Sequence, residues 1–173
     1  NGTAFTENPK VWSFDGVDDM IPLNSSVNMG QAGSLSFWLK RDNQTGTIMG
    51  EPSYTFKYVV YINGTVITLR CGSNYRSFTA GASTTALNTT DWVHIVFTRD
   101  VSITDLKFYV DGTLTQTHTT FNSNDFLLGG IGGVPSMTFA GIECEIGAVH
   151  AYNRVLSANE VLHNYNALKN RFV

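Results

Sequence analysis

Residues 141–172, GIECEIGAVHAYNRVLSANEVLHNYNALKNRF, predict a long strand followed by a turn and a closing helix. In the first part of this stretch, residues 141–152, apolar side chains recur at every second position. These positions are Ile142, Cys144, Ile146 and Ala148. A period of two residues is typical of a β-strand with one buried face. We therefore expect these four side chains to cover the core of the protein.

The second part of the stretch predicts an amphipathic helix with a defined start. Ser157 followed by Glu160 has the spacing of a capping box, in which the serine accepts a hydrogen bond from the first turn and the glutamate reaches back. Apolar residues then recur at helical spacing. This stripe consists of Val161, Tyr165, Leu168 and Phe172. We expect the stripe to lie on the body of the protein, so that the helix closes a β domain.

The composition favours one domain with a substantial core. The chain has 173 residues, of which 42% are hydrophobic and 14% charged, and its net charge is −3. This charge does not favour binding to nucleic acid or to an anionic membrane. No apolar run approaches the roughly 20 residues that span a bilayer. The chain starts without a methionine or a signal peptide, and we expect residues 1–173 to be a single domain taken from a longer protein.

Further alternation predicts about ten short strands, which favours a sandwich of two sheets. Residues 35–40 are an example, with leucine and phenylalanine on one face and Trp38 on the other, where we expect a loop to cover it. Asn-Gly at 63–64 and Asp-Gly at 111–112 predict hairpin turns. Residues 72–90 read as a long polar loop, and residues 121–137 as a glycine-rich loop with one short strand at 126–128.

The two cysteines, Cys71 and Cys144, have no neighbouring cysteine, which excludes a zinc knuckle. Both lie on apolar faces of predicted strands. A disulfide and two buried free thiols both remain open, and burial on apolar faces favours the thiols.

Two motifs resemble a known family. Residues 146–157, IGAVHAYNRVLS, are similar to the pattern I-D-E-V-R-I-Y-N-R-A-L-S in laminin-G-like domains of the concanavalin A-like lectin/glucanase superfamily. Residues 14–21, FDGVDDMI, resemble the F-D-G-x-D-D-Y-I signature of the same family. The resemblance implies an all-β, concanavalin A-like jelly-roll sandwich of two antiparallel sheets with a short C-terminal helix. The ending at 158–172 also resembles such domains in structural proteins of tailed bacteriophages.

The sequence argues against an enzyme. Glycoside hydrolases of the resembled fold carry a Glu-x-Asp-x-x-Glu strand, which supplies paired carboxylates. Glu143 and Glu145 share a strand face, but no acidic residue follows them, and we interpret them as a solvated face. The four histidines are scattered and lack metal-ligand spacing.

Calcium is the one cofactor that the sequence suggests. Asp15, Asp18 and Asp19 lie in a tight turn and could supply carboxylate ligands. The resemblance implies a further aspartate from the last strand, at a position where this chain has Gly147. The alternative is that the aspartates only shape the turn through hydrogen bonds to the backbone. Both interpretations remain open.

Aromatic and polar side chains in predicted loops form a candidate glycan site. The residues proposed to contact a ligand are Trp12, Tyr54, Asn74, Tyr75, Arg76 and Phe78. A guanidinium beside two rings could stack on a sugar and also donate hydrogen bonds. The alternative is that Phe78 anchors the loop in the core and Tyr75 shields it. Trp92 opens a strand at a position where the family has a packing tryptophan.

The preferred function is a non-catalytic recognition module, glycan-binding, in a tail, neck or fibre protein of a phage virion. Its expected partners are a cell-surface glycan or polysaccharide and other virion proteins, at the virion surface or outside the cell. One alternative is a carbohydrate-binding or adhesin module of a secreted bacterial protein. Another is a structural decoration domain of a virion that binds no sugar.

Overall fold

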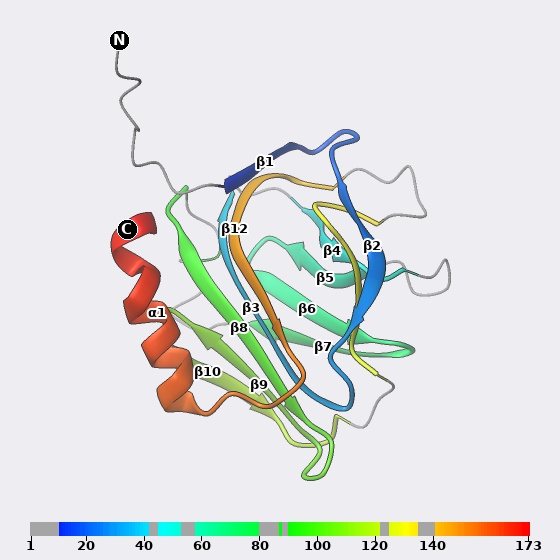
Figure 1. Cartoon of the computed structure of the whole chain (residues 1–173), viewed down its shortest axis with the longest axis vertical. Coiled ribbons are helices and arrows are strands. Elements are labelled where there is room, and N and C mark those ends of the chain that lie inside the picture. The colour runs from blue at the N-terminus through cyan, green and yellow to red at the C-terminus, as the bar shows by residue number, and fades with distance from the viewer. Residues whose placement is uncertain are drawn as a thin grey trace.

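The computed structural model describes residues 11–41, 45–52, 58–79, 87, 90–121, 125–134 and 141–173. Over these residues the chain forms a sandwich of two six-stranded sheets with one helix on an outer face (Figure 1). All named strand pairs are antiparallel. The predicted fold class is confirmed. No helix of the described residues is long and apolar enough to cross a membrane.

The two sheets are named here by their position relative to the helix α1 (Ala158–Phe172), which lies on sheet A. Sheet A has the spatial order β1 (Val11–Asp15), β12 (Glu143–Tyr152), β3 (Ala32–Arg41), β8 (Val93–Asp100), β9 (Asp105–Val110) and β10 (Thr113–His118). Sheet B has the order β2 (Ile21–Asn28), β11 (Leu127–Ile131), β4 (Gly46–Gly50), β5 (Tyr58–Asn63), β6 (Val66–Cys71) and β7 (Asn74–Thr79).

Strand β3 shows how the sequence pattern builds the layers. Leu35, Phe37 and Leu39 face the core between the sheets, as their alternation predicts. Trp38 points the other way but is also fully buried. Its cover is helix α1 rather than the loop we expected, since its ring stacks on Phe172 at a centroid distance of 4.6 Å.

Helix α1 docks through the predicted stripe. Val161 and Phe172 are buried, whereas Tyr165 and Leu168 are half-buried. The capping box is present, because Ser157 Oγ accepts from the backbone of Glu160 and the Glu160 carboxylate accepts from the backbone of Ser157. The helix therefore starts where the sequence predicts and covers the outer face of sheet A.

The last strand differs from the prediction at one point. Ile142, Cys144 and Ile146 are in the core, but the register between β12 and β3 shifts after Gly147. Ala148 there adopts a left-handed backbone with φ of 46°. Because this bulge reverses the faces, Val149 packs against the core in place of Ala148.

Residues 72–90 are not a single loop. They include β7, the edge strand of sheet B, which pairs with β6 from Val66↔Thr79 to Cys71↔Asn74. The strand in the glycine-rich region is β11, which runs to Ile131 rather than ending at residue 128. Short edge strands of mostly polar residues carry little periodic signal, because one face contributes only one or two apolar side chains.

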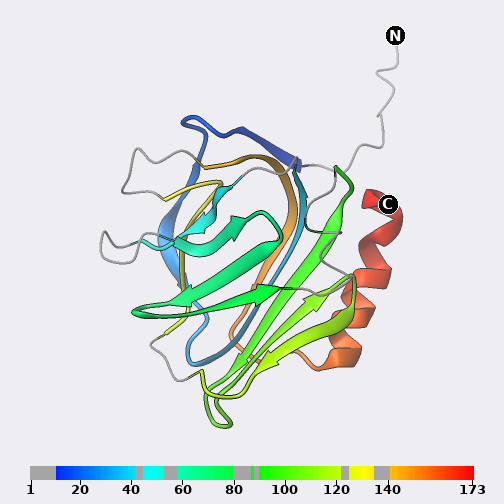
Figure 2. The ribbon, with the colours of Figure 1, turned by 180° about the vertical axis from the view of Figure 1, so that it is seen from behind.

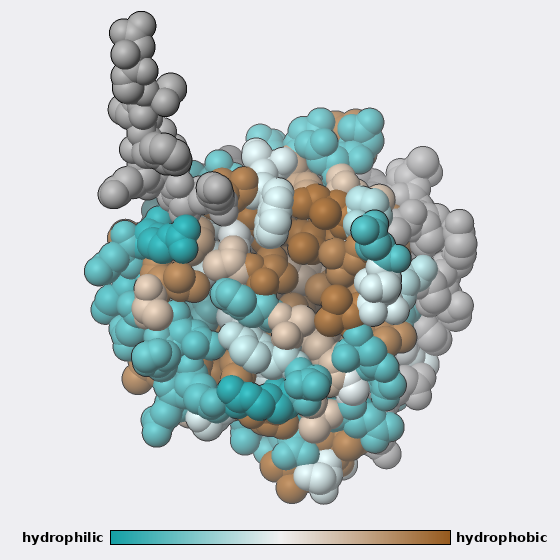
Figure 3. All heavy atoms as spheres, viewed as in Figure 1, coloured by the Kyte–Doolittle hydropathy of each residue, from teal (hydrophilic) through white to brown (hydrophobic). Residues whose placement is uncertain are grey.

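Both cysteines are free and buried, as the burial argument favoured. On the side of the molecule seen in Figure 3, apolar side chains are visible between β12 and β2. Half-buried Ile21 and Leu23 of β2 and Val149 of β12 pack against the core. Apolar side chains that pack against the core are therefore visible at the surface between β12 and β2.

Candidate functional site

Tyr75 presents an exposed ring on sheet B. It lies on β7 opposite Arg70 of β6, and its side chain is 53% exposed. The guanidinium carbon of Arg70 lies 5.3 Å from the centre of the tyrosine ring. Such a cation–π contact is worth about 0.5–1 kcal/mol at an exposed site and favours this orientation of the ring.

Two hydroxyl-bearing side chains lie on the same face of the sheet as this ring, the exposed Ser77 and the buried Thr68. Ser77 lies two residues after Tyr75 and shares a hydrogen bond of 2.9 Å with the hydroxyl of Thr68. Tyr61 of β5 pairs with Thr68, and paired residues of neighbouring strands share a face. We call this set the β6–β7 surface; it consists of Tyr61, Thr68, Arg70, Tyr75 and Ser77. In Figure 2 the strands β5 to β7 lie toward the viewer.

Arg76 and Phe78 point to the opposite face, toward the core. Phe78 is fully buried and its ring contacts those of Phe97 and Phe108 at 5.6 and 5.1 Å. Arg76 donates hydrogen bonds of 2.9 Å to the carbonyl oxygens of Tyr75 and Thr120. The expectation that Tyr75, Arg76 and Phe78 meet one ligand is therefore wrong, and Phe78 is the anchor that the alternative described.

The remaining predicted ligand residues are dispersed. Asn74 is exposed at the start of β7, next to Tyr75. Trp12 is 45% exposed on β1, the edge strand of sheet A, where it pairs with Ile146. Trp12 therefore belongs to the other sheet from Tyr75. Tyr54 lies outside the described residues.

Sequence reasoning missed Arg70 and Tyr61. The Asn-Gly hairpin at residues 63–64 sets the register between β5 and β6. The pair Gly72-Ser73 is a second two-residue turn, and it sets the register between β6 and β7 so that Tyr75 lies across from Arg70. The polar composition of residues 72–90 predicts a loop instead, and a loop gives no such register.

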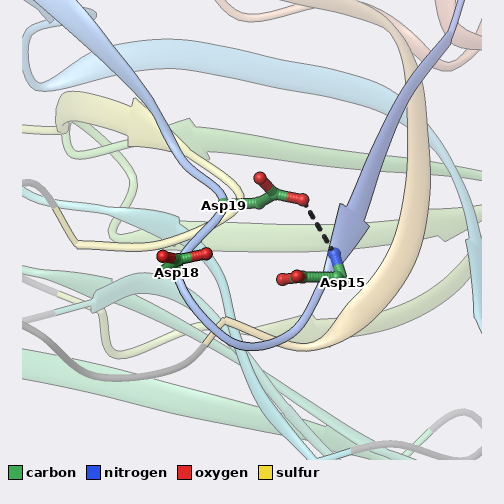
Figure 4. Close-up of side chains that lie close together, drawn as sticks. All are labelled: Asp15, Asp18 and Asp19. Atoms are coloured by element: carbon green, nitrogen blue, oxygen red, sulfur yellow. Dashed lines mark hydrogen bonds between the residues drawn. The ribbon is translucent and has the colours of Figure 1, made fainter.

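The three aspartates gather in one turn. Each of Asp15, Asp18 and Asp19 offers a carboxylate oxygen, and these atoms lie within 4.8 Å of one another (Figure 4). The backbone N–H of Asp15 donates to Asp19 Oδ2 at 3.1 Å, and that of Val17 donates to Asp15 Oδ1 at 2.8 Å. These local bonds are the turn-shaping role that the sequence left open. They leave further carboxylate oxygens for a cation.

A cavity of about 360 Å³ adjoins this turn. Asp15 and Asp19 line it together with Glu143 and Glu145 of β12, and Glu145 forms an ion pair of 3.2 Å with Lys40. Cys144 also lines it, but burial raises the pKa of this thiol to about 12, so the thiol stays protonated at neutral pH. The oxygen donors of the lining are these carboxylates and the hydroxyls of Ser13 and Thr90, and the cationic side chains of Lys40 and Arg41 line the same cavity.

Gly147 lies away from the aspartate turn along β12. Gly147 pairs with Val11, whereas the partner of Asp15 is Glu143, four residues earlier on β12. This separation along a strand is about 13 Å. A side chain at Gly147 would instead meet the ring of Phe172, since an added Cβ would lie 2.8 Å from it. The residue beside the turn is thus an acidic one, and the set fits a hard cation such as Ca²⁺.

Comparison with known proteins decides the family. Residues 15–162 match the family described as the concanavalin A-like lectin/glucanases superfamily. The chain belongs to this superfamily. The match covers most of the chain, and the predicted resemblance is confirmed at this level. No protein of curated function matches the sequence significantly.

Solved structures share the fold of this superfamily domain. The receptor binding domain of botulinum neurotoxin C/D mosaic serotype is 18% identical with a TM-score of 0.68, and the match covers 91% of this chain and 42% of that one. The botulinum neurotoxin serotype D ligand binding domain in complex with N-acetylneuraminic acid has the same identity and coverages, with a TM-score of 0.66. This chain therefore spans under half the length of these neurotoxin chains.

A heptameric SAP-like pentraxin from Limulus polyphemus gives a TM-score of 0.72 at 13% identity, and the match covers 92% of this chain and 82% of that one. At these identities the likeness concerns the fold. The superfamily domain described here is lectin-like in architecture.

Proposed function

We propose that this lectin-like domain is a non-catalytic recognition module that binds glycans through the β6–β7 surface. The observation that carries the proposal is the exposed ring of Tyr75, which lies against the Arg70 guanidinium and two residues from the exposed hydroxyl of Ser77. A sugar presents an apolar C–H face and a rim of hydroxyls. An aromatic ring matches the first, and hydroxyl and guanidinium groups match the second.

We propose a non-catalytic module because the acidic side chains of the chain do not form a glycoside hydrolase pattern. The sequence has no Glu-x-Asp-x-x-Glu strand. Glu143 and Glu145 lie on the same face of β12, as expected, and Glu145 is held in its ion pair with Lys40. The matched neurotoxin structures are receptor or ligand binding domains.

For the parent protein we propose a tail, neck or fibre protein of a phage virion. The support is the resemblance of residues 158–172 to the ends of such domains. A secreted bacterial adhesin or carbohydrate-binding protein, and a virion decoration domain without a ligand, are the alternatives. Sequencing the genes on either side of the domain, and detecting the protein on purified virions, distinguishes the three.

Replacing Tyr75 by alanine should weaken glycan binding about tenfold or more while leaving thermal stability unchanged. The contact between this ring and a ligand is worth roughly 1.4 kcal/mol or more. The exposed ring packs little against the rest of the fold. A glycan array identifies the ligand, and calorimetric titration with the best hit measures the affinity of both proteins.

Arg76→Ala is the matched control on the same strand. It removes two hydrogen bonds to backbone carbonyls, so we expect the free energy of unfolding to fall by roughly 1–3 kcal/mol with binding retained. Wild-type affinity in Tyr75→Ala would remove the β6–β7 surface from consideration. A folded wild-type domain without any array hit would support the structural decoration alternative.

We also propose that the aspartate turn and Glu143 hold a structural Ca²⁺. The support is the convergence of three exposed carboxylates beside a cavity with a fourth opposite Asp15. Bound calcium would neutralise this group and tie β1 to β12. Chelation with EDTA should then lower the melting temperature, and added Ca²⁺ should restore it.

Asp19→Asn is the control for the calcium proposal, because it keeps the size of the side chain but removes one charged ligand. Its melting temperature should no longer respond to EDTA or Ca²⁺. If the wild-type protein melts at the same temperature with and without chelator, the aspartates serve only the turn.

A further inference from the structure

A cavity of about 370 Å³ lies between the end of β12 and the first turns of α1. It is lined by the half-buried ring of Tyr152 at the end of β12, and by polar side chains of α1 and of the connection between them. The polar and aromatic residues of its lining are Tyr152, Arg154, Asn159, Glu160, His163 and Asn164. Since β12 belongs to sheet A, this cavity is separate from the β6–β7 surface on sheet B.

The walls of this cavity are held by a chain of contacts that begins at the capping box. Glu160 accepts hydrogen bonds of 2.8 and 2.9 Å from Ser157, and its other oxygen forms an ion pair of 2.7 Å with Arg154. The guanidinium carbon of Arg154 lies 5.9 Å from the centre of the Tyr152 ring. The ring of Tyr152 also packs against the buried cluster of Val96, Tyr109, Leu156 and Val161, so its orientation is set before a ligand binds.

Tyr152 lines the cavity, and its hydroxyl keeps a proton that could be donated to a ligand. This hydroxyl accepts a hydrogen bond of 3.3 Å from the Asn164 side chain, which leaves its own proton to donate. Asn159 and His163 are exposed on the adjoining helix turns and offer both donors and acceptors. The helix N-terminus itself is not involved, since Ser157 caps it.

The charges in the cavity cancel. The hydrogen bonds from Ser157 and the nearby Arg154 lower the pKa of Glu160, so the carboxylate is ionised at neutral pH and offsets the guanidinium. The remaining polar lining consists of amides, a phenol and an imidazole. An anionic ligand would find no unpaired cation in this set.

We propose that this cavity is a second saccharide site, which takes a neutral, hydroxyl-bearing sugar unit. A ring with a fixed orientation, flanked by amide, imidazole and phenol groups, matches the mixed surface of an uncharged pyranose. Capping of the helix requires Ser157 and Glu160 only. Packing places the ring of Tyr152, and neither capping nor packing uses the exposed side chain of His163.

The test is a titration of the isotope-labelled chain, followed by NMR at each backbone amide. The probes are the methyl glycosides of glucose, galactose and mannose, N-acetylglucosamine, and N-acetylneuraminic acid as the anionic sugar. We expect at least one neutral sugar to shift the amides of Tyr152, Asn159 and His163. Tyr152→Phe, which keeps the ring, and His163→Ala should each weaken this binding about 3- to 10-fold, the loss of one hydrogen bond.

Tyr75→Ala separates the second site from the β6–β7 surface. Shifts around α1 that persist in Tyr75→Ala and fall in Tyr152→Phe support the second site, whether or not the first one binds. Shifts confined to β6 and β7, or no shift around α1 with any neutral sugar, overturn it. N-acetylneuraminic acid binding at α1 as tightly as the neutral sugars overturns it as well.

Discussion

Truncating the chain at Asn159 should lower the free energy of unfolding by about 3–6 kcal/mol or more. The truncation removes Val161 and Phe172, two buried apolar side chains worth roughly 1.5–3 kcal/mol each. It also uncovers Trp38, which lies under the rings of Phe172 and Tyr165 at centroid distances of 4.6 and 5.7 Å. Urea unfolding followed by circular dichroism and tryptophan fluorescence measures the loss.

Two point variants keep this prediction testable if the truncated chain does not fold. Phe172→Ala should cost about 3 kcal/mol, because it leaves a cavity over Trp38 and beside Trp92, whose ring lies 4.9 Å from that of Phe172. Asn166→Ala, on the exposed side of the same helix, should change stability by no more than about 0.5 kcal/mol. A truncated domain that unfolds at the same urea concentration as the full chain would show that α1 does not support the sandwich.

The helix was predictable because its signals are local. Ser157 and Glu160 mark its start within four residues, and the apolar stripe follows at regular spacing. Its partner was not predictable in the same way. Trp38 and Phe172 are far apart in the sequence, and their contact depends on how β3 and β12 are paired.

Strand registers explain the other differences. Alternation identified Ile142, Cys144 and Ile146 as core residues, but a period of two carries no sign of the bulge at Ala148. Which acidic residue lies beside the aspartate turn also depends on strand register. Only the pairing of β1 with β12 shows that Glu143 lies beside Asp15.

The candidate glycan site was predicted in part. Composition identified Tyr75 and its polar surroundings, and its exposure agrees with a surface role. In a strand, successive side chains point to opposite faces, so Tyr75 and Arg76 cannot both meet one ligand above the sheet. The weak apolar pattern of residues 74–79 predicts a loop rather than an edge strand. A loop carries no such alternation, so the sequence alone does not separate Tyr75 from Arg76.

Lowering the pH from 7 to 5 should reduce the free energy of unfolding by about 2 kcal/mol through His94 alone. This side chain is almost fully buried beneath α1, between the rings of Trp38 and Tyr165 at centroid distances of 5.1 and 6.0 Å. Burial, with a smaller contribution from the nearby His150, lowers the pKa of His94 from 6.5 to about 4. Nδ1 of His94 has no hydrogen-bond partner among the described residues, and Nε2 shares a bond of 2.9 Å with Ser36 Oγ.

The direction of this change in stability follows from the pKa values of His94 in the folded and the unfolded chain. The fold holds the imidazole neutral, whereas the unfolded chain takes up a proton as the pH falls below about 6.5. The stabilisation is therefore complete above this pH and is lost progressively until the pH reaches about 4, where the folded form is protonated too. Burial raises the pKa of Asp111, so protonation of that carboxyl acts in the opposite direction.

His94→Gln isolates this contribution, because glutamine keeps a polar group near Ser36 but does not titrate. Urea unfolding of both proteins at pH 7, 6 and 5 measures the difference between their slopes. The range ends at pH 5 so that carboxylates with ordinary pKa values near 4 contribute little. We expect the wild-type curve to fall and the variant curve to be flatter by about 2 kcal/mol over this range, even if the variant is less stable throughout. Parallel curves would mean that solvent reaches His94 beneath the helix and that α1 does not seal the outer face of sheet A.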